Sequence, residues 1–110
     1  MKTRIFELQA SIVRSCFMDV AVVRNEAASR FETIVDDVVC VLEYRLDGEV
    51  ITLLHTGVPD AVGGRGIAGA LNRTALDTAR KEGWRVVPAC AYSVTYIARH
   101  PQYEDLVSRA

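Results

Sequence analysis

The chain has 110 residues and a formal net charge of −1, with 50% hydrophobic and 25% charged residues. This ordinary globular mixture fits one compact domain. A charge so near zero gives no basic field to attract nucleic acid or an anionic membrane surface. No apolar run reaches the roughly 20 residues that a membrane-spanning helix needs. We therefore expect neither nucleic acid nor a membrane as a partner.

The cysteines bear on the compartment and on metal binding. Cys16, Cys40 and Cys90 are odd in number and widely spaced, and no pair has the spacing of metal ligands. A secreted disulfide framework would need more of them. Polar residues also interrupt positions 1–17, so this segment does not resemble a secretory signal. We expect a cytoplasmic protein with free thiols and no metal.

The first half of the chain carries β signals. Residues 1–17 have a weak helical rhythm and are predicted to be an extension ahead of a domain over residues 18–110. Strands are predicted at residues 20–23, 30–35, 38–46 and 49–56. A two-residue hairpin loop is predicted at Asp47-Gly48. That register pairs Cys40 with His55, so His55 is expected on the apolar face of the sheet.

The second half alternates helix and strand signals. A helix is predicted from about residue 66 to residue 82, because apolar residues recur at helical spacing and Gly83 can end it in a left-handed cap. A strand at 84–89 and C-terminal helices follow. Strand 49–56, the helix and strand 84–89 have the length of a right-handed crossover, so the two strands should be parallel. The predicted fold class is α/β (α+β), with a mixed sheet: a four-strand antiparallel meander, then a parallel strand–helix–strand unit and C-terminal helices.

A glycine-rich turn leads into this helix, with the sequence Gly63-Gly64-Arg65-Gly66-Ile67-Ala68-Gly69. Backbone N–H groups at a helix N-terminus lack partners, the helix dipole adds positive charge, and glycine allows a ligand to approach closely. Arg65 adds a formal charge, so a pyrophosphate is the expected occupant. The lysine and hydroxyl of a Walker loop are missing, and the turn does not open a repeated βαβ fold, which argues against a dinucleotide site. The alternative is a tight turn without a ligand.

Gly66-Ile67-Ala68 matches the last part of the signature Q/R-x-x-G-x-G/A, while Gly63 occupies its first position. The turn thus resembles the acetyl-CoA pyrophosphate loop of the GNAT N-acetyltransferase superfamily. A closer resemblance is to the very small, single-domain GNAT-like proteins labelled YjdJ-like, and it extends in the right order over about residues 20–108. The matching segments are residues 25–32, 42–46, 55–59, 64–68, 87–90 and 96–103.

This resemblance implies acetyl-CoA as the cosubstrate and an amine as the acceptor. The two parallel strands would part and admit the pantetheine arm, which would pair with main-chain groups near Thr56 and Val58. The glycine-rich turn would hold the pyrophosphate, and the thioester would lie near Cys90. In many members of the superfamily a tyrosine after the last strand protonates the departing CoA thiolate, and Tyr96 matches that position better than Tyr92.

Several side chains are candidates for the chemistry, each with a structural alternative. Cys90 ends a strand, where α/β sites are built, and could accept the acyl group as a thiolate or line the channel as a buried residue. Tyr96 is a candidate general acid or a packing residue. His55 is a candidate base for the amine or a histidine of the core. Glu43, expected on the opposite face, could act through water or be only an exposed strand residue.

The leading hypothesis is an acetyl-CoA-dependent N-acetyltransferase in which the amine attacks the thioester directly, with covalent relay through Cys90 as the variant. The alternative function is non-catalytic binding of acetyl-CoA or CoA, since so short a chain has little material for an acceptor pocket. A generic phosphate-binding domain, which would prefer nucleotides without pantetheine, is a further alternative. Small amines, peptide N-termini and lysine side chains all stay open as acceptors. Exposed edge strands predict a monomer or a weak dimer.

Overall fold

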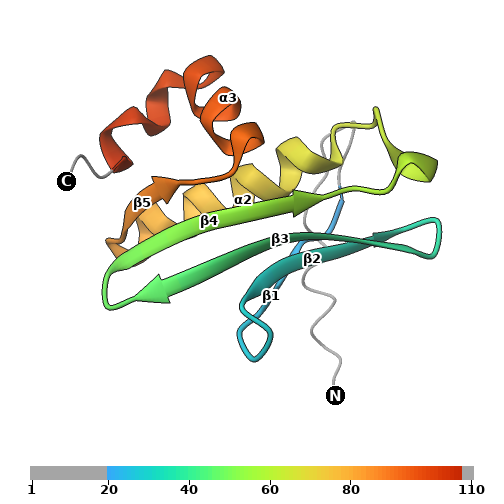
Figure 1. Cartoon of the computed structure of the whole chain (residues 1–110), viewed down its shortest axis with the longest axis horizontal. Helices are drawn as coiled ribbons and strands as arrows, with labels where there is room; N and C mark the ends of the chain where they lie inside the picture. Colours follow the sequence, from blue (N-terminus) through green and yellow to red (C-terminus); the bar gives the residue numbers. More distant parts are fainter. Residues whose placement is uncertain (1–19, 108–110) are drawn as a thin grey trace.

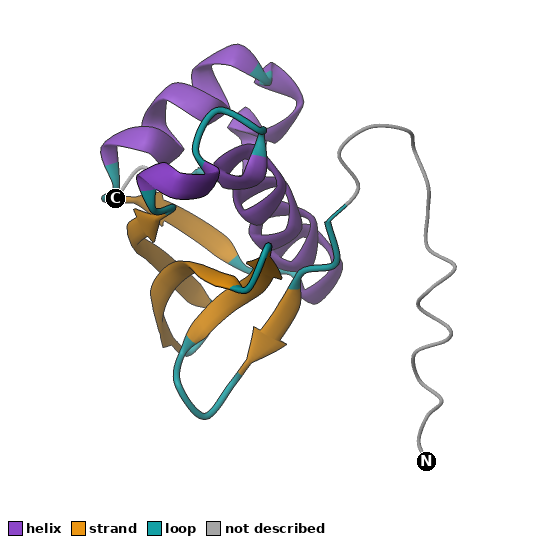
Figure 2. Ribbon diagram, turned by 90° about the vertical axis from the view of Figure 1, so that its right-hand side faces the viewer, coloured by secondary structure: helices purple, strands orange, loops and turns teal. Residues whose placement is uncertain are grey.

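The computed structural model describes residues 20–107 as a five-stranded sheet with helices on one face (Figure 1, Figure 2). The strands lie side by side in chain order. The extension predicted at residues 1–17 lies outside the described residues. The elements are β1 (Val23–Asn25), β2 (Arg30–Val35), β3 (Val38–Asp47), β4 (Val50–Gly57), the 3-10 helix η1 (Asp60–Val62), α2 (Ile67–Glu82), β5 (Arg85–Pro88), α3 (Ala91–Arg99) and the 3-10 helix η2 (Pro101–Leu106).

The strand directions confirm the predicted mixed sheet. Strands β1 to β4 form an antiparallel meander, and β5 runs parallel to β4. The crossover between these two parallel strands is α2, which packs against β2, β3, β4 and β5. Both α3 and η2 contact α2, so the helices gather on one side of the sheet (Figure 2). Within residues 20–107 no helix covers the other face, which we call the open face.

The first strand lies later in the chain than the sequence predicts. The expected segment was residues 20–23, whereas β1 extends to Asn25, which still pairs with Arg30 at the edge of the turn. Earlier in the chain, the Thr33 hydroxyl donates a hydrogen bond to the Ala21 carbonyl oxygen at 2.8 Å. A side-chain bond therefore holds this segment to β2, and the regular ladder begins only closer to the turn.

The β3–β4 hairpin has a different loop from the predicted one. Asp47 pairs with Val50, which leaves Gly48 and Glu49 between the strands. Gly48 has a φ of +60°, as the first loop residue of a type II′ turn requires, and glycine adopts this value without strain. The shift in register is even, so the predicted apolar residues keep their face. The buried members of that face are Cys40, Leu42, Tyr44, Ile51 and Leu53.

A β-bulge at Leu54 reverses the faces at the end of β4. Leu53 and His55 pair with consecutive residues of β3, so Leu54 between them has no partner in β3. Beyond the bulge, Thr56 points toward the helices, while His55 lies on the open face opposite Glu43. The expectation that His55 lies on the apolar face is therefore wrong, because it assumed unbroken alternation along the strand. His55 is exposed.

The helix α2 supplies the helical side of the core. Its predicted apolar stripe is fully buried and consists of Ile67, Leu71, Ala75 and Ala79. The helix ends at Gly83, whose φ of +78° is the left-handed cap that the sequence predicts. The next helix, α3, begins at Ala91, with Cys90 at the N-cap position.

Candidate functional site

The parallel strands β4 and β5 part where β5 ends. Their pairing stops at Leu53 and Pro88, and the N–H groups of Ala89 and Cys90 both donate to the Leu53 carbonyl oxygen, at 3.0 and 2.9 Å. Strand β4 continues to Gly57, while the chain after β5 turns into α3 (Figure 1). From the bulge onward β4 therefore has an edge that β5 does not occupy, and an extended ligand could pair with this edge as a strand would.

The glycine-rich turn follows β4 and ends at the N-terminus of α2. Gly64 and Gly66 have φ values of +77° and +79°, and Gly66 is the N-cap. A Cβ at either position would meet nothing within 4 Å, so the backbone conformation, and not crowding, requires glycine. The first turn of α2 holds no acidic residue, and no side chain caps it. The N–H groups of Ile67, Ala68 and Gly69 are thus available to an anion.

Gly63 and Arg65 complete the turn. Gly63 has φ −68° and ψ 162°, an extended conformation that other residues adopt easily. Arg65 donates from Nη1 to Oδ2 of Asp36 at 2.8 Å, and Asp36 lies in the turn between β2 and β3. The Arg65 side chain is 48% exposed and that of Asp36 is 67% exposed. Since exposed ion pairs contribute little, a phosphate could displace the carboxylate from Arg65.

Two tyrosines of α3 lie over the first turn of α2. A Cβ at Gly69 would stand 3.5 Å from Tyr92 Oη and 3.5 Å from Tyr96 Cε1. Tyr96 also stacks on His100, with 4.0 Å between ring centroids. Burial raises the pKa of Tyr96, so its hydroxyl keeps its proton at neutral pH. The structure thus brings Tyr96, in a form that can donate a proton, to the glycine-rich turn.

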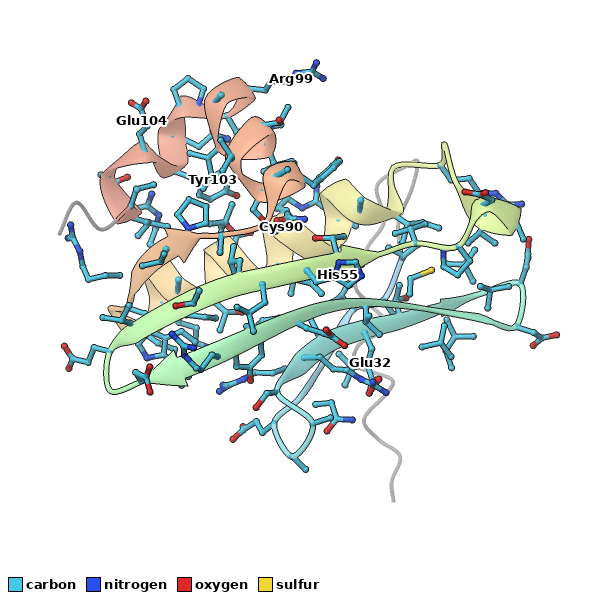
Figure 3. The ribbon with its side chains drawn as sticks, in the orientation of Figure 1. Glu32, His55, Cys90, Arg99, Tyr103 and Glu104 are labelled. Carbon is cyan, nitrogen blue, oxygen red and sulfur yellow. The ribbon has the colours of Figure 1, made fainter. Side chains whose placement is uncertain are left out.

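Cys90 is half-buried at the N-cap of α3, beside the end of β4 (Figure 3). Its Sγ lies 3.5 Å from Thr56 Oγ1. Burial raises the pKa of the Cys90 thiol, but the Thr56 hydroxyl and backbone N–H groups of Ser93, Tyr92 and Thr56 outweigh burial, so the pKa falls below its ordinary value. The thiolate is the reactive form of cysteine. Cys40 differs, because burial alone acts on its thiol and raises the pKa.

Two buried polar side chains that the sequence analysis did not identify also belong to this site. Asn72 of α2 and Ser93 of α3 are both 0% exposed. Asn72 Nδ2 donates to Thr56 Oγ1 at 3.3 Å and to the Ala68 carbonyl oxygen at 2.9 Å. The Ser93 hydroxyl donates to Asn72 Oδ1 at 2.5 Å. The sequence signal for Asn72 is its helical spacing before the buried Ala75. An amide buried at that position must find hydrogen-bond partners.

His55 and Glu43 lie apart from this cluster, on the open face. They are opposite each other across β4 and β3, and both are exposed. Figure 3 labels His55 on β4 and Cys90 at the start of α3. The candidate residues therefore divide between the two faces of β4, with Thr56 and Cys90 on the helix side.

Val58 follows β4 and packs, half-buried, against the core.

Among residues 20–107 no group of three or more His, Cys, Asp or Glu side chains could hold a metal ion. No helix in that part of the chain is long and apolar enough to cross a membrane.

The chain is similar to known proteins over most of its length. A family model described as GCN5-related N-acetyl-transferase matches residues 30–106. Protein NATD1 of Mus musculus is 35% identical over 78 residues, which cover 71% of this chain and 70% of that protein. Protein NATD1 of Homo sapiens is also 35% identical over 78 residues, or 71% of this chain and 68% of that protein. An NMR solution structure of a GCN5-like protein from Staphylococcus aureus matches with a TM-score of 0.64 at 22% identity, covers 82% of this chain and 89% of that chain, and supports the fold.

Proposed function

The chain belongs to the GCN5-related N-acetyltransferase family, and we propose that it transfers an acetyl group from acetyl-CoA to an amine. The observation that carries this proposal is the parting of β4 and β5 directly before a glycine-rich turn that opens α2. An unoccupied strand edge followed by an anion site suits a linear, amide-bearing arm that ends in a pyrophosphate. Acetyl-CoA has this chemistry.

Each part of acetyl-CoA has a place in this arrangement. The N–H groups of Gly66, Ile67, Ala68 and Gly69, together with Gly63, Gly64 and Arg65, bind the pyrophosphate. The pantetheine arm runs along the free edge of β4, past the backbone of Thr56 and Val58. The thioester then reaches Cys90. This placement uses the backbone for most contacts, which agrees with the open space around the main chain at Gly64 and Gly66.

In direct transfer, the amine nitrogen attacks the thioester carbonyl carbon and the bond to the CoA sulfur breaks. The proton of the amine passes to His55, which lies on the open face where an acceptor approaches without crossing the helices. Glu43 lies opposite His55 on the same face. Tyr96 gives its proton to the departing CoA thiolate.

Covalent relay through Cys90 is the variant. The Cys90 thiolate attacks the carbonyl carbon, CoA leaves as a thiolate, and S-acetyl-Cys90 remains until the amine attacks it and releases the Cys90 thiolate. The lowered pKa of Cys90, caused by Thr56 and backbone N–H groups against the effect of burial, supports this route. Full turnover by Cys90→Ala would exclude it, whereas loss of turnover together with acetylated Cys90 in the unmodified protein would favour it.

The first test is calorimetric titration with acetyl-CoA. We expect micromolar binding by the unmodified protein and loss of binding in Gly66→Asp, which adds a carboxylate beside the pyrophosphate. Gly66→Asn is the matched control, because asparagine has the same shape, tolerates the left-handed conformation and carries no charge. Absence of binding by the unmodified protein would contradict the proposal. A panel of small amines, peptides and lysine-containing proteins then identifies the acceptor.

The alternative is non-catalytic binding of acetyl-CoA or CoA. The observation in its favour is that His55 and Glu43 are both exposed, on a face that no helix covers within residues 20–107. Tight binding of CoA without acetyl transfer to any amine would support this alternative. Equal binding of nucleotides without pantetheine would point instead to a generic phosphate-binding domain.

A further inference from the structure

A chain of hydrogen bonds links the interior of the protein to the sulfur of Cys90. Its members are Ser93 of α3, Asn72 of α2 and Thr56 of β4. Ser93 and Asn72 are 0% exposed, so water does not replace these bonds in the folded protein. These hydrogen bonds connect three separate elements at the place where α2, α3 and β4 meet.

The direction of these bonds follows from one backbone carbonyl. The Ala68 oxygen can only accept, so the atom of the Asn72 amide that lies 2.9 Å from it must be the nitrogen. One amide hydrogen is used at Ala68, and the other is available for Thr56 Oγ1 at 3.3 Å. The amide oxygen then accepts from the Ser93 hydroxyl at 2.5 Å. The Asn72 amide therefore has its two donors and its acceptor satisfied inside the protein.

The same argument orients Thr56. Its oxygen accepts from Asn72, which leaves the hydroxyl hydrogen free to point at Cys90 Sγ, 3.5 Å away. A donor aimed at the sulfur favours the thiolate over the thiol. Because all three bonds run toward the sulfur, each polarises the next. Burial of Cys90 acts in the opposite sense, so a half-buried thiolate needs such a donor.

We propose that Asn72 and Ser93 are positioning residues: they orient the Thr56 hydroxyl toward Cys90 and so keep the Cys90 sulfur nucleophilic. The use of this sulfur in acetyl transfer rests on the proposed function, but the orientation of Thr56 does not. The largest influences on the Cys90 pKa are burial and hydrogen bonds, and none of them comes from the charged or titratable side chains on the elements around Cys90. In residues 20–107 those on β4, β5, α2 and the N-terminal part of α3 are His55, Arg85, Arg73, Asp77, Arg80, Lys81, Glu82, Tyr92 and Tyr96.

The test is the pH dependence of Cys90 alkylation by iodoacetamide, followed by peptide mass spectrometry. Asn72→Leu and Thr56→Val are expected to move the alkylation profile to higher pH and to slow the reaction at neutral pH by about 10-fold, the effect of losing one hydrogen bond to a charged group. Thr56→Ser keeps a hydroxyl and is expected to keep the profile. Thr74→Val is the matched control, since it removes a hydroxyl of α2 that donates only to the Ala70 carbonyl oxygen.

An unchanged profile in folded Thr56→Val and Asn72→Leu would overturn the proposal. So would an equal shift in Thr74→Val, which would mean that any loss of a polar contact in α2 has this effect. If Asn72→Leu does not fold, as judged by circular dichroism, Ser93→Ala takes its place and is expected to shift the profile in the same direction. Calorimetry with acetyl-CoA is carried out separately, so that failure of cofactor binding counts against the proposed function and not against this positioning role.

Discussion

Removal of the Asp36 carboxylate is expected to strengthen acetyl-CoA binding. In the free protein Arg65 donates to Asp36 at 2.8 Å, so a pyrophosphate at the glycine-rich turn must compete with this carboxylate for the guanidinium. Asp36→Asn removes the charge and keeps the shape of the side chain. Asp36 has a φ of 51°, and asparagine adopts this left-handed conformation as easily as aspartate, so the turn itself should be preserved.

The size of the effect is limited by exposure. The side chains of Arg65 and Asp36 are 48% and 67% exposed, and exposed pairs contribute about 0.2–1 kcal/mol. Since 1.4 kcal/mol corresponds to a factor of ten, the dissociation constant for acetyl-CoA should fall by about fivefold at most. The gain should shrink as salt rises, because an electrostatic effect between exposed groups is screened.

Calorimetric titration with acetyl-CoA at low and high salt measures this difference. Asp37→Asn is the control: Asp37 has a φ of 65° in the same turn and forms no ion pair with Arg65. Arg65→Ala should weaken binding and should abolish the benefit of Asp36→Asn in the double variant. Weaker binding in Asp36→Asn, or the same gain in Asp37→Asn, would refute the idea that Asp36 competes with the pyrophosphate.

Three further outcomes are expected. Gly66→Ala should lower the free energy of unfolding by about 1–2 kcal/mol in urea denaturation, because the φ of +79° at Gly66 is left-handed. Gly63→Ala should leave the free energy of unfolding unchanged, because Gly63 is extended. An equal loss of stability in the two variants would contradict this reasoning. His55→Gln should reduce acetyl transfer and leave the dissociation constant for acetyl-CoA unchanged; a loss of both would mean that His55 supports binding. Cys90 should react with iodoacetamide at a lower pH than an ordinary thiol needs, since Thr56 and backbone N–H groups lower its pKa against the effect of burial. Cys40, whose pKa burial raises, should react only after unfolding.

Much of the fold follows from local patterns. The alternation in residues 30–35 and the helical spacing before Gly83 depend only on neighbours along the chain, and both elements were confirmed. The glycine-rich turn is equally local, because the positive φ values of Gly64 and Gly66 require the residue type itself. The family resemblance was confirmed as well. The roles of Cys90 and the other site residues stay predictions.

The tertiary structure alone decided which candidate residues meet. The bulge at Leu54 comes from the way β3 and β4 pair, and it puts His55 on the open face of the sheet. Simple alternation along the strand predicts the apolar face instead. The contacts of Asn72 with Thr56 and Ser93 join three elements that are distant in sequence. Backbone conformation and periodicity are local properties that a sequence carries in neighbouring residues. Strand register and buried polar contacts depend on packing between distant segments, and only the folded chain determines them.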